Sequence, residues 1–416
     1  MKYILVFLNL ILAVCTGSAQ EYTLLLKGGT LIDPKNNINT MMDVAVKEGV
    51  IAEVGRNIPP SKAKQVIDIS GLYITPGLID IHGHVFAGTT PEGDLSDGFS
   101  SLHPDGYTFR VGVTTIVDAG GPGAANFEIF KKNIIDRSRT RVLAFLNISS
   151  AGMKGHEYTE YQQDVKYFDA QLAAETAKKY KDYIVGIKVA HFHSPDFIAV
   201  DRTVEAGRLA NMPIMVDFGG SKPRLSIEEL FMKRMRPGDI FTHVYGELLE
   251  TKEAIVDIET NTLKPFVLKA RDRGIIFDVG HGGASFRYSQ AIPALKAGLY
   301  PHTISTDLHT GSMNAAMKDM LNVMSKFMTM GMPLPEVIKA STWKSAQVIN
   351  REELGHLSVG AVADIAVLNL KKGKFGFYDV TRYKQVGSEK LECEMTIKGG
   401  NIVYDLNAIA IPATGK

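Results

Sequence analysis

The sequence predicts an α/β protein: a (β/α)8 barrel, the TIM-barrel architecture, with a small discontinuous β-sandwich domain formed by both ends of the chain. Three observations lead to this prediction. Eight apolar, strand-like runs alternate with helical segments over most of the chain. Short β-rich runs separated by turns occupy both ends. A strand followed by Lys-Gly-Gly and a polar residue occurs at 26–30 and again at 396–401.

The barrel prediction rests on the alternation of the two kinds of segment. Alternating strands and helices imply a parallel sheet, and eight such units over this length imply a closed barrel. The predicted strands are Leu78–His82, Thr114–Asp118, Val142–Ile148, Ile184–Val189, Pro213–Asp217, Asp239–His243, Ile275–Val279 and Thr303–Asp307. The predicted helices are Glu128–Arg137, Leu172–Tyr180, Asp201–Asn211, Ile227–Met235, Leu263–Arg273 and Ala315–Met330. The methionines between Met313 and Met332 are expected to pack in the core.

The two ends of the chain are expected to pair with each other. Hairpin-like runs precede residue 72, and β-rich runs return after residue 352. We therefore expect a small β-domain made of residues 21–72 and 352–416, beside a barrel of residues 73–351.

Composition narrows the classes of function. The chain has 416 residues, a formal net charge of +1, 45% hydrophobic residues and 22% charged residues. These are ordinary globular values. The near-zero net charge argues against a nucleic-acid surface or a polybasic membrane patch. A small-molecule substrate is the expected partner, and a homo-oligomer is compatible with the sequence.

The first twenty residues differ from the rest. Lys2, an apolar run from Tyr3 to Cys15 and small residues before Gln20 predict a secretory signal peptide over residues 1–20. The run is short for a membrane span, so no stable span is expected in the mature chain. After cleavage Cys393 is the one cysteine left, and export without disulfides favours a bacterial periplasm. A lipoprotein anchored through Cys15 is the first alternative, and a retained membrane anchor is the second.

The first predicted barrel strand ends in two histidines. His82 and His84 are two residues apart, so on a strand their side chains point to the same face. Neutral imidazole is the commonest metal ligand. The pair is therefore half of a candidate metal site, although an isolated His-x-His is equally compatible with two structural histidines.

Other ligand-capable side chains lie on or just after later predicted strands. Active sites of (β/α)8 barrels lie at the carboxyl ends of the strands. Lys188 lies on the fourth strand, and Asp217, His243 and Asp307 end the fifth, sixth and eighth. Each has an ordinary structural explanation when taken alone. Their shared position indicates a common site.

Several motifs occur together in a known order. They are Pro76-Gly-Leu-Ile-Asp-Ile-His-Gly-His, Gly112-Val-Thr-Thr-Ile-Val-Asp-Ala-Gly, Gly186-Ile-Lys-Val, Phe241-Thr-His, Asp278-Val-Gly-His-Gly-Gly and Ser305-Thr-Asp. With them the chain resembles the amidohydrolase superfamily from about Tyr22 to Tyr404. Within it the chain resembles the dihydroorotase-like and hydantoinase-like branch, and most of all the amidohydrolase/deacetylase group of metallohydrolases.

The resemblance implies a metal site of one or two divalent ions, zinc or manganese. His82, His84 and Asp307 would bind the first ion, and His243 the second. Lys188 would be carboxylated on its amine and bridge the two ions as an anion.

One position departs from the family pattern. Family members usually have a histidine at the end of strand five, where this chain has Asp217. A carboxylate also ligates zinc, and it suits manganese somewhat better. We expect Asp217 to keep the second metal; weaker binding or a single-metal site are the alternatives. His191 and His193 are interpreted as loop histidines, with ligand substitution as the alternative.

The resemblance implies hydrolysis of an amide or ester bond by a metal-bound hydroxide, with Asp307 as proton shuttle. His281 would contact the substrate. Deacylation or deacetylation of an N-acyl amino acid-like compound is the leading prediction. A cyclic-amide hydrolase of the dihydroorotase or hydantoinase type, and a non-catalytic metal- or ligand-binding barrel, are the alternatives.

Overall fold

The computed structural model describes residues 20–248 and 250–412. The predicted signal peptide, apart from Gln20, lies outside these residues, as does Cys15, so cleavage, export and lipidation stay predictions. Within the described ranges, no helix combines the length and the apolar character that crossing a membrane requires.

A seven-stranded parallel sheet forms the centre of the molecule, in the order β16-β13-β12-β11-β10-β9-β8. Its strands are β8 (Leu78–Gly83), β9 (Val113–Gly123), β10 (Arg141–Asn147), β11 (Ile184–Val189), β12 (Ile214–Val216), β13 (Ile240–Phe241) and β16 (Ile276–Phe277). Each coincides with one of the first seven predicted runs. Their residues are almost all buried, as expected for a parallel sheet covered on both faces.

The predicted eighth strand, Thr303–Asp307, is not a continuous strand. It makes two isolated parallel bridges, one from Thr303 to Asp278 and one from Leu308 to Gly83. The segment therefore connects the two edges of the curled sheet, which is consistent with the predicted barrel. Its extended course is interrupted because Asp307 has a left-handed backbone, with φ of 52°.

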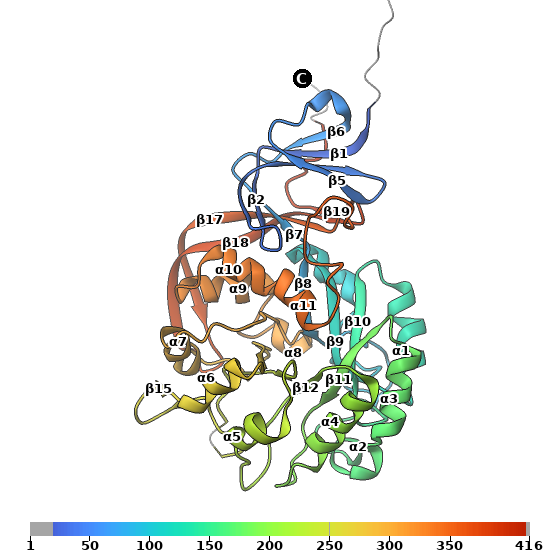
Figure 1. Cartoon of the computed structure of the whole chain (residues 1–416), viewed down its shortest axis with the longest axis vertical. Helices are drawn as coiled ribbons and strands as arrows, with labels where there is room; N and C mark the ends of the chain where they lie inside the picture. Colours follow the sequence, from blue (N-terminus) through green and yellow to red (C-terminus); the bar gives the residue numbers. More distant parts are fainter. Residues whose placement is uncertain (1–19, 249, 413–416) are drawn as a thin grey trace, which may run out of the picture.

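Helices cover the outside of the sheet, and Figure 1 shows α1, α3 and α4 on the side of β9, β10 and β11. The longer helices are α1 (Phe127–Asn133), α3 (Ala170–Lys179), α4 (Ile198–Ala210), α6 (Pro265–Asp272), α7 (Tyr288–Lys296), α9 (Met320–Thr329), α10 (Leu334–Ala340) and α11 (Trp343–Val348). The shorter ones are α2 (Glu160–Gln163), α5 (Ile227–Glu229) and α8 (Thr310–Met313). Helix α9 begins later than predicted because Asp319 caps it, accepting a 2.7 Å hydrogen bond from the Asn322 N–H. Met320 and Met324 are fully buried, which confirms core packing for these two methionines.

Both ends of the chain contribute to the remaining sheets. A four-stranded sheet contains β5 (Val50–Gly55), β4 (Asp43–Lys47), β1 (Tyr22–Lys27) and β6 (Ala63–Asp68). A six-stranded sheet contains β19 (Asn401–Asp405), β18 (Lys384–Lys398), β17 (Ile365–Tyr378), β7 (Tyr73–Pro76), β2 (Thr30–Asp33) and β3 (Ile38–Met41). The antiparallel pair β17–β7 joins segments from the two halves of the chain, although β7 begins just after the predicted domain boundary at residue 72. A short hairpin of β14 (Val256–Asp257) and β15 (Thr262–Leu263) lies apart.

The terminal strands share an apolar core. Leu26 and Val44 from the first sheet pack in one buried cluster with Ile365 and Ile397 from the second. The β17–β18 hairpin extends beyond this cluster to the central body, where the Leu391 N–H donates to the Ser325 hydroxyl of α9 at 3.0 Å. In Figure 1 this orange and red hairpin lies between the blue strands and helices α9 and α10. The exact domain boundaries stay a prediction.

Candidate active site

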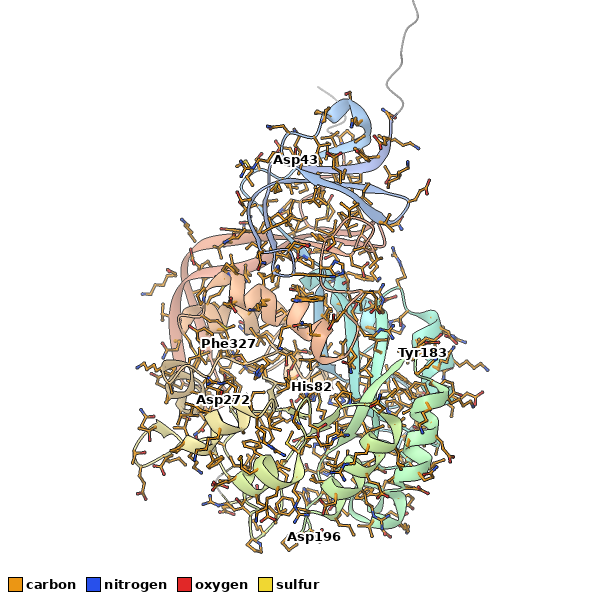
Figure 2. All side chains as sticks on the ribbon, in the orientation of Figure 1. Asp43, His82, Tyr183, Asp196, Asp272 and Phe327 are labelled. Carbon is orange, nitrogen blue, oxygen red and sulfur yellow. The ribbon has the colours of Figure 1, made fainter. Side chains whose placement is uncertain are left out.

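Three predicted ligands meet at the carboxyl ends of the parallel strands. Ligand atoms of His82, His243 and Asp307 all lie within 4.8 Å of one another. His82 comes from β8, His243 follows β13, and Asp307 lies in the segment that connects the sheet edges. Figure 2 shows His82 inside the central body, far from Asp43 in the four-stranded sheet. The sheet therefore brings together residues that are far apart in the sequence.

His82 presents a lone pair to this site. The Thr242 hydroxyl donates a 2.7 Å hydrogen bond to Asp278. Its oxygen therefore accepts the 2.9 Å hydrogen bond from His82 Nδ1–H. Nε2 of His82 is then unprotonated and lies 3.6 Å from Asp307 Oδ1. Burial, reinforced by Lys188, lowers the pKa of His82 to about 3, so the ring is neutral. A neutral imidazole in this tautomer is prepared for a metal ion.

Asp307 is an ionised carboxylate beside two histidines. Its Oδ1 lies 3.0 Å from His84 Nε2. Burial would raise the pKa of Asp307, but His82, His84 and His243 outweigh it and hold this pKa well below its usual range. The other ring nitrogen of His84, Nδ1, is buried and has no hydrogen-bond partner among the described residues. The pair therefore combines an ionised carboxylate with a histidine whose buried Nδ1 lacks a hydrogen-bond partner among the described residues.

His243 faces Asp217 through its Nε2. His243 Nδ1 lies 2.6 Å from the carbonyl oxygen of Gly280, which can only accept, so Nδ1 carries a proton. Nε2 then lies 3.3 Å from Asp217 Oδ2. Burial would lower the pKa of His243, but the Asp217 carboxylate raises it overall. Two facing acceptors at this distance need either a proton or a cation between them.

Lys188 is fully buried at the centre of the site. Its Nζ lies 3.3 Å from His82 Nε2 and 3.7 Å from Met215 Sδ. Burial lowers the pKa of Lys188, although Asp217 and Asp307 act in the opposite direction. An amine in this setting is poorly stabilised as an ammonium.

Two further predicted residues have defined positions. His281 is fully buried, with Nε2 2.7 Å from Lys326 Nζ and Nδ1 2.9 Å from the Gly282 carbonyl oxygen. Substrate contact by His281 stays a prediction. His191, interpreted from sequence as a loop histidine, lies 3.5 Å from Asp217 Oδ2 through its Nε2.

Three of these residues have a strained backbone. His191, His243 and Asp307 adopt positive φ angles of 56°, 54° and 52°. Such conformations are uncommon for residues other than glycine and cluster at functional sites. They mark the turns where the chain leaves β11 and β13 and where it reconnects to β8.

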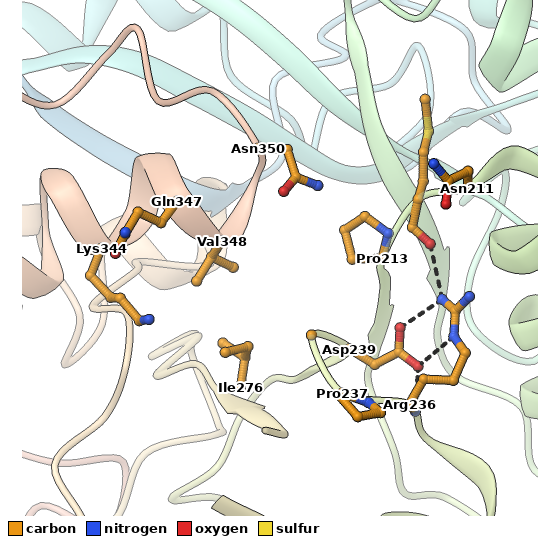
Figure 3. A pocket seen from close by; sticks show the side chains of 12 residues that line it. Asn211, Pro213, Arg236, Pro237, Asp239, Ile276, Lys344, Gln347, Val348 and Asn350 are labelled. Atoms are coloured by element: carbon orange, nitrogen blue, oxygen red, sulfur yellow. Dashed lines mark hydrogen bonds and ion pairs between the residues drawn. The ribbon is translucent and has the colours of Figure 1, made fainter. Parts of the chain in front are cut away.

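A cavity of about 710 Å³ opens onto the site. Its lining includes Asp217, His243, Asp307, His191, His193 and Lys252. A second cavity, of about 410 Å³, lies at the opposite, amino-terminal ends of β12, β13 and β16 (Figure 3). There Arg236 already pairs with Asp239 at 2.7 Å and donates to the Met212 carbonyl at 2.9 Å. The first cavity is therefore the candidate active site.

Sequence reasoning missed two contributors. Asp278 follows β16 and accepts hydrogen bonds from Thr242, Thr303 and Ser305. Asp278 opens the motif Asp278-Val-Gly-His-Gly-Gly that contributes to the family resemblance, but it is not among the site residues predicted from the sequence. Lys252 lies in the loop after β13, and its sequence context gives no comparable signal. Its buried ammonium donates to the His243 carbonyl oxygen at 3.0 Å.

Replacing Asp278 with asparagine is expected to weaken the affinity of the site for an added divalent ion by about 10- to 100-fold, the usual effect of losing a group that orients a ligand. The amide removes the charged acceptor that fixes Thr242, and Thr242 fixes the tautomer of His82. Competition with a chelator measures the change. Asp272→Asn, at an exposed carboxylate on α6 that pairs with neighbouring Arg271, is the control. Unchanged affinity in Asp278→Asn would contradict this role.

The geometry defines an α/β protein with clustered histidine and carboxylate side chains at the carboxyl ends of a parallel sheet. Comparisons with known proteins specify the family. A model of the amidohydrolase family matches residues 264–404. A deacetylase of Agrobacterium fabrum is 35% identical over 327 residues, 78% of this chain and 77% of the relative. A deacetylase of Brucella anthropi is 34% identical over 328 residues, 78% of each chain. The chain belongs to the amidohydrolase superfamily.

Solved structures agree with this placement. The crystal structure of an adenine deaminase has a TM-score of 0.81 and 28% identity, and covers 92% of this chain and 100% of that chain. A dihydroorotase has a TM-score of 0.80 and 30% identity, and covers 92% and 99%. The protein is thus a hydrolase of the amidohydrolase family, with deacetylases among its relatives.

Proposed function

We propose that the protein is a metal-dependent hydrolase that removes an acyl group, in particular acetyl, from a small N-acyl amino acid-like substrate. The bond cleaved is an amide, or an ester at the same position. The observation that carries the proposal is the pair of facing acceptors, His243 Nε2 and Asp217 Oδ2, at 3.3 Å beside the His82–Asp307 cluster. The deacetylase relatives support the choice of reaction.

The donor set fits divalent cations. Imidazole and carboxylate are ligands that both zinc and manganese accept. His82, His84 and Asp307 would hold one ion, and His243 with Asp217 a second. When bound, such ions supply Lewis acidity and an activated water.

Lys188 is proposed to carry a carboxylated amine. Only a neutral amine is nucleophilic, and burial lowers the pKa of Lys188 toward the range where that form is available. The nitrogen forms a bond to the carbon of carbon dioxide and releases a proton, which gives a carbamate anion. This anion would replace a poorly solvated ammonium with two oxygen ligands among His82, Asp217 and Asp307.

Asp307 is proposed to be the proton carrier. It is ionised, lines the cavity and lies next to His84. Its carboxylate can accept a proton from the attacking water and deliver it to the leaving nitrogen or oxygen. The divalent ions next to Asp307 would be held and oriented by the other side chains of the site, His82, His84, Lys188, Asp217 and His243.

A cyclic-amide hydrolase is the second candidate, favoured by the likeness to a dihydroorotase at 30% identity. Two assays with zinc- and manganese-loaded protein separate the candidates. The first measures acetate release from N-acetyl amino acids of both chiralities and from O-acetyl hydroxy acids. The second measures ring opening of dihydroorotate and hydantoin. Acetate release from the acetylated compounds is the expected result. Ring opening alone would support the second candidate, and no turnover with a full metal complement would favour a binding barrel.

A further inference from the structure

The candidate active site contains a buried cation that the proposed chemistry does not use. Lys252 is 4% exposed and lines the same cavity as Asp217, His243 and Asp307. Its ammonium donates one hydrogen bond, to the His243 carbonyl oxygen at 3.0 Å. Among the residues that the structure describes, no carboxylate forms an ion pair with it, and Asp217 is engaged by His191 and His243.

The surroundings of Lys252 are shaped to hold this side chain. A Cβ added at Gly246 would lie 3.2 Å from the ammonium nitrogen, and one at Gly219 would lie 3.1 Å from the Lys252 Cβ. Both glycines line the cavity. On another side the ammonium lies 5.2 Å from the centre of the Phe241 ring. Side chains at these two glycine positions would crowd Lys252, so the glycines leave the space that this lysine occupies.

An unpaired buried charge is costly unless an anion compensates it. An ammonium has three N–H donors, and one of them is used by the His243 carbonyl. Lys222, another lysine of the cavity lining, differs because it is exposed and pairs with Glu250 at 2.7 Å. Lys252 is therefore the better placed of the two to receive an anionic group that enters the cavity.

We propose that Lys252 binds the carboxylate of the substrate, so that the enzyme prefers N-acyl amino acids with a free carboxylate over the corresponding neutral amides. The proposal rests on the proposed function and adds the group that selects the substrate class. Lys252 orients the substrate with its acyl carbonyl toward Asp307 and His243, and it takes no part in proton transfer.

The test compares N-acetylalanine, in the preferred enantiomer, with N-acetylalaninamide. In Lys252→Met the preference for the carboxylate, measured as the ratio of the two kcat/KM values, is expected to fall by about 10- to 100-fold, the range of one charged hydrogen bond. The loss should appear mainly in KM. Lys252→Arg should recover part of the preference, and Lys222→Met, which removes an already paired lysine, should retain most of it.

Calorimetric binding of both compounds in the Asp307→Asn background separates this inference from the proposed function. If the wild type hydrolyses neither compound but N-acetylalanine binding still depends on Lys252, the proposed function fails and the carboxylate site stands. Equal losses for the acid and the amide, with melting temperature and metal content like the wild type, would overturn the inference. Equal losses with reduced metal content would also overturn it, since Lys252 would then act only by holding His243.

Discussion

Asp307→Asn is expected to lower kcat by about 10³-fold or more, at the upper end of what a general acid–base group contributes. Asparagine keeps the shape of the side chain, but its amide cannot accept the proton that the carboxylate would carry. The negative charge beside His82, His84 and His243 also disappears. The loss should therefore appear in kcat for every substrate of the protein, including those without a carboxylate.

Metal content and melting temperature are measured on the same preparation. We expect metal to remain largely bound, because the other ligands of the site are unchanged. Asp257→Asn, at a carboxylate in the β14–β15 hairpin that accepts bonds within its own turn, is a control outside the site. Activity of Asp307→Asn within tenfold of the wild type would show that another group carries the proton.

Lys188→Met is expected to abolish activity and metal binding while leaving the metal-free protein as stable as the wild type, or more stable. Methionine has a similar length and no charge. It therefore removes an amine whose contacts are an imidazole nitrogen and a thioether sulfur. Burying an amine without strong hydrogen-bond partners is costly, so replacing it with an apolar side chain of similar length is expected to be neutral or stabilising. Melting curves in the presence of a chelator, together with metal analysis and turnover, test this.

The two halves of this expectation fail separately. Retained metal and turnover in Lys188→Met would contradict the role of the lysine in the site. A large drop in the melting temperature of the metal-free variant would show that the amine stabilises the fold. Lys178→Met, at an exposed position of α3, controls for the substitution itself.

Local patterns predict the central strands well. The strands from β8 to β13, and β16, lie within or overlap the predicted runs because fully buried parallel strands are continuous apolar segments bounded by turns. The same pattern predicts His82, His243 and Asp307 at one end of the sheet, and the structure brings them together. It also predicts Asp217 and Lys188 at this end, and their side chains lie beside His243 and His82.

Features that depend on tertiary contacts are harder to predict. Residues 303–307 look like a strand, but Asp307 turns into the left-handed region where its N–H donates to the His82 carbonyl. Helix α7 is absent from the predicted helices because Pro293 lies inside it. The cap of α9 has a local signal, an Asp three residues before Asn322, but the apolar pattern continues past it toward the amino terminus.

The site itself depends on contacts that no short motif encodes. Asp278 acts on His82 through the hydroxyl of Thr242, which follows a different strand. Lys252 enters the cavity from a loop, and its neighbours Gly219 and Gly246 lie in the separate loops that follow β12 and β13. The spacing of these residues along the sequence does not show that their side chains are in contact.

Electron density around Lys188 and Asp217, in crystals of protein prepared with zinc or manganese, tests the central claim most directly. We expect an extended carbamate on Lys188 and one or two ions about 2.0–2.2 Å from histidine and carboxylate ligands, if zinc is bound. One ion should contact His82, His84 and Asp307. An unmodified lysine with no ion at the cluster, despite metal in excess, would contradict the account.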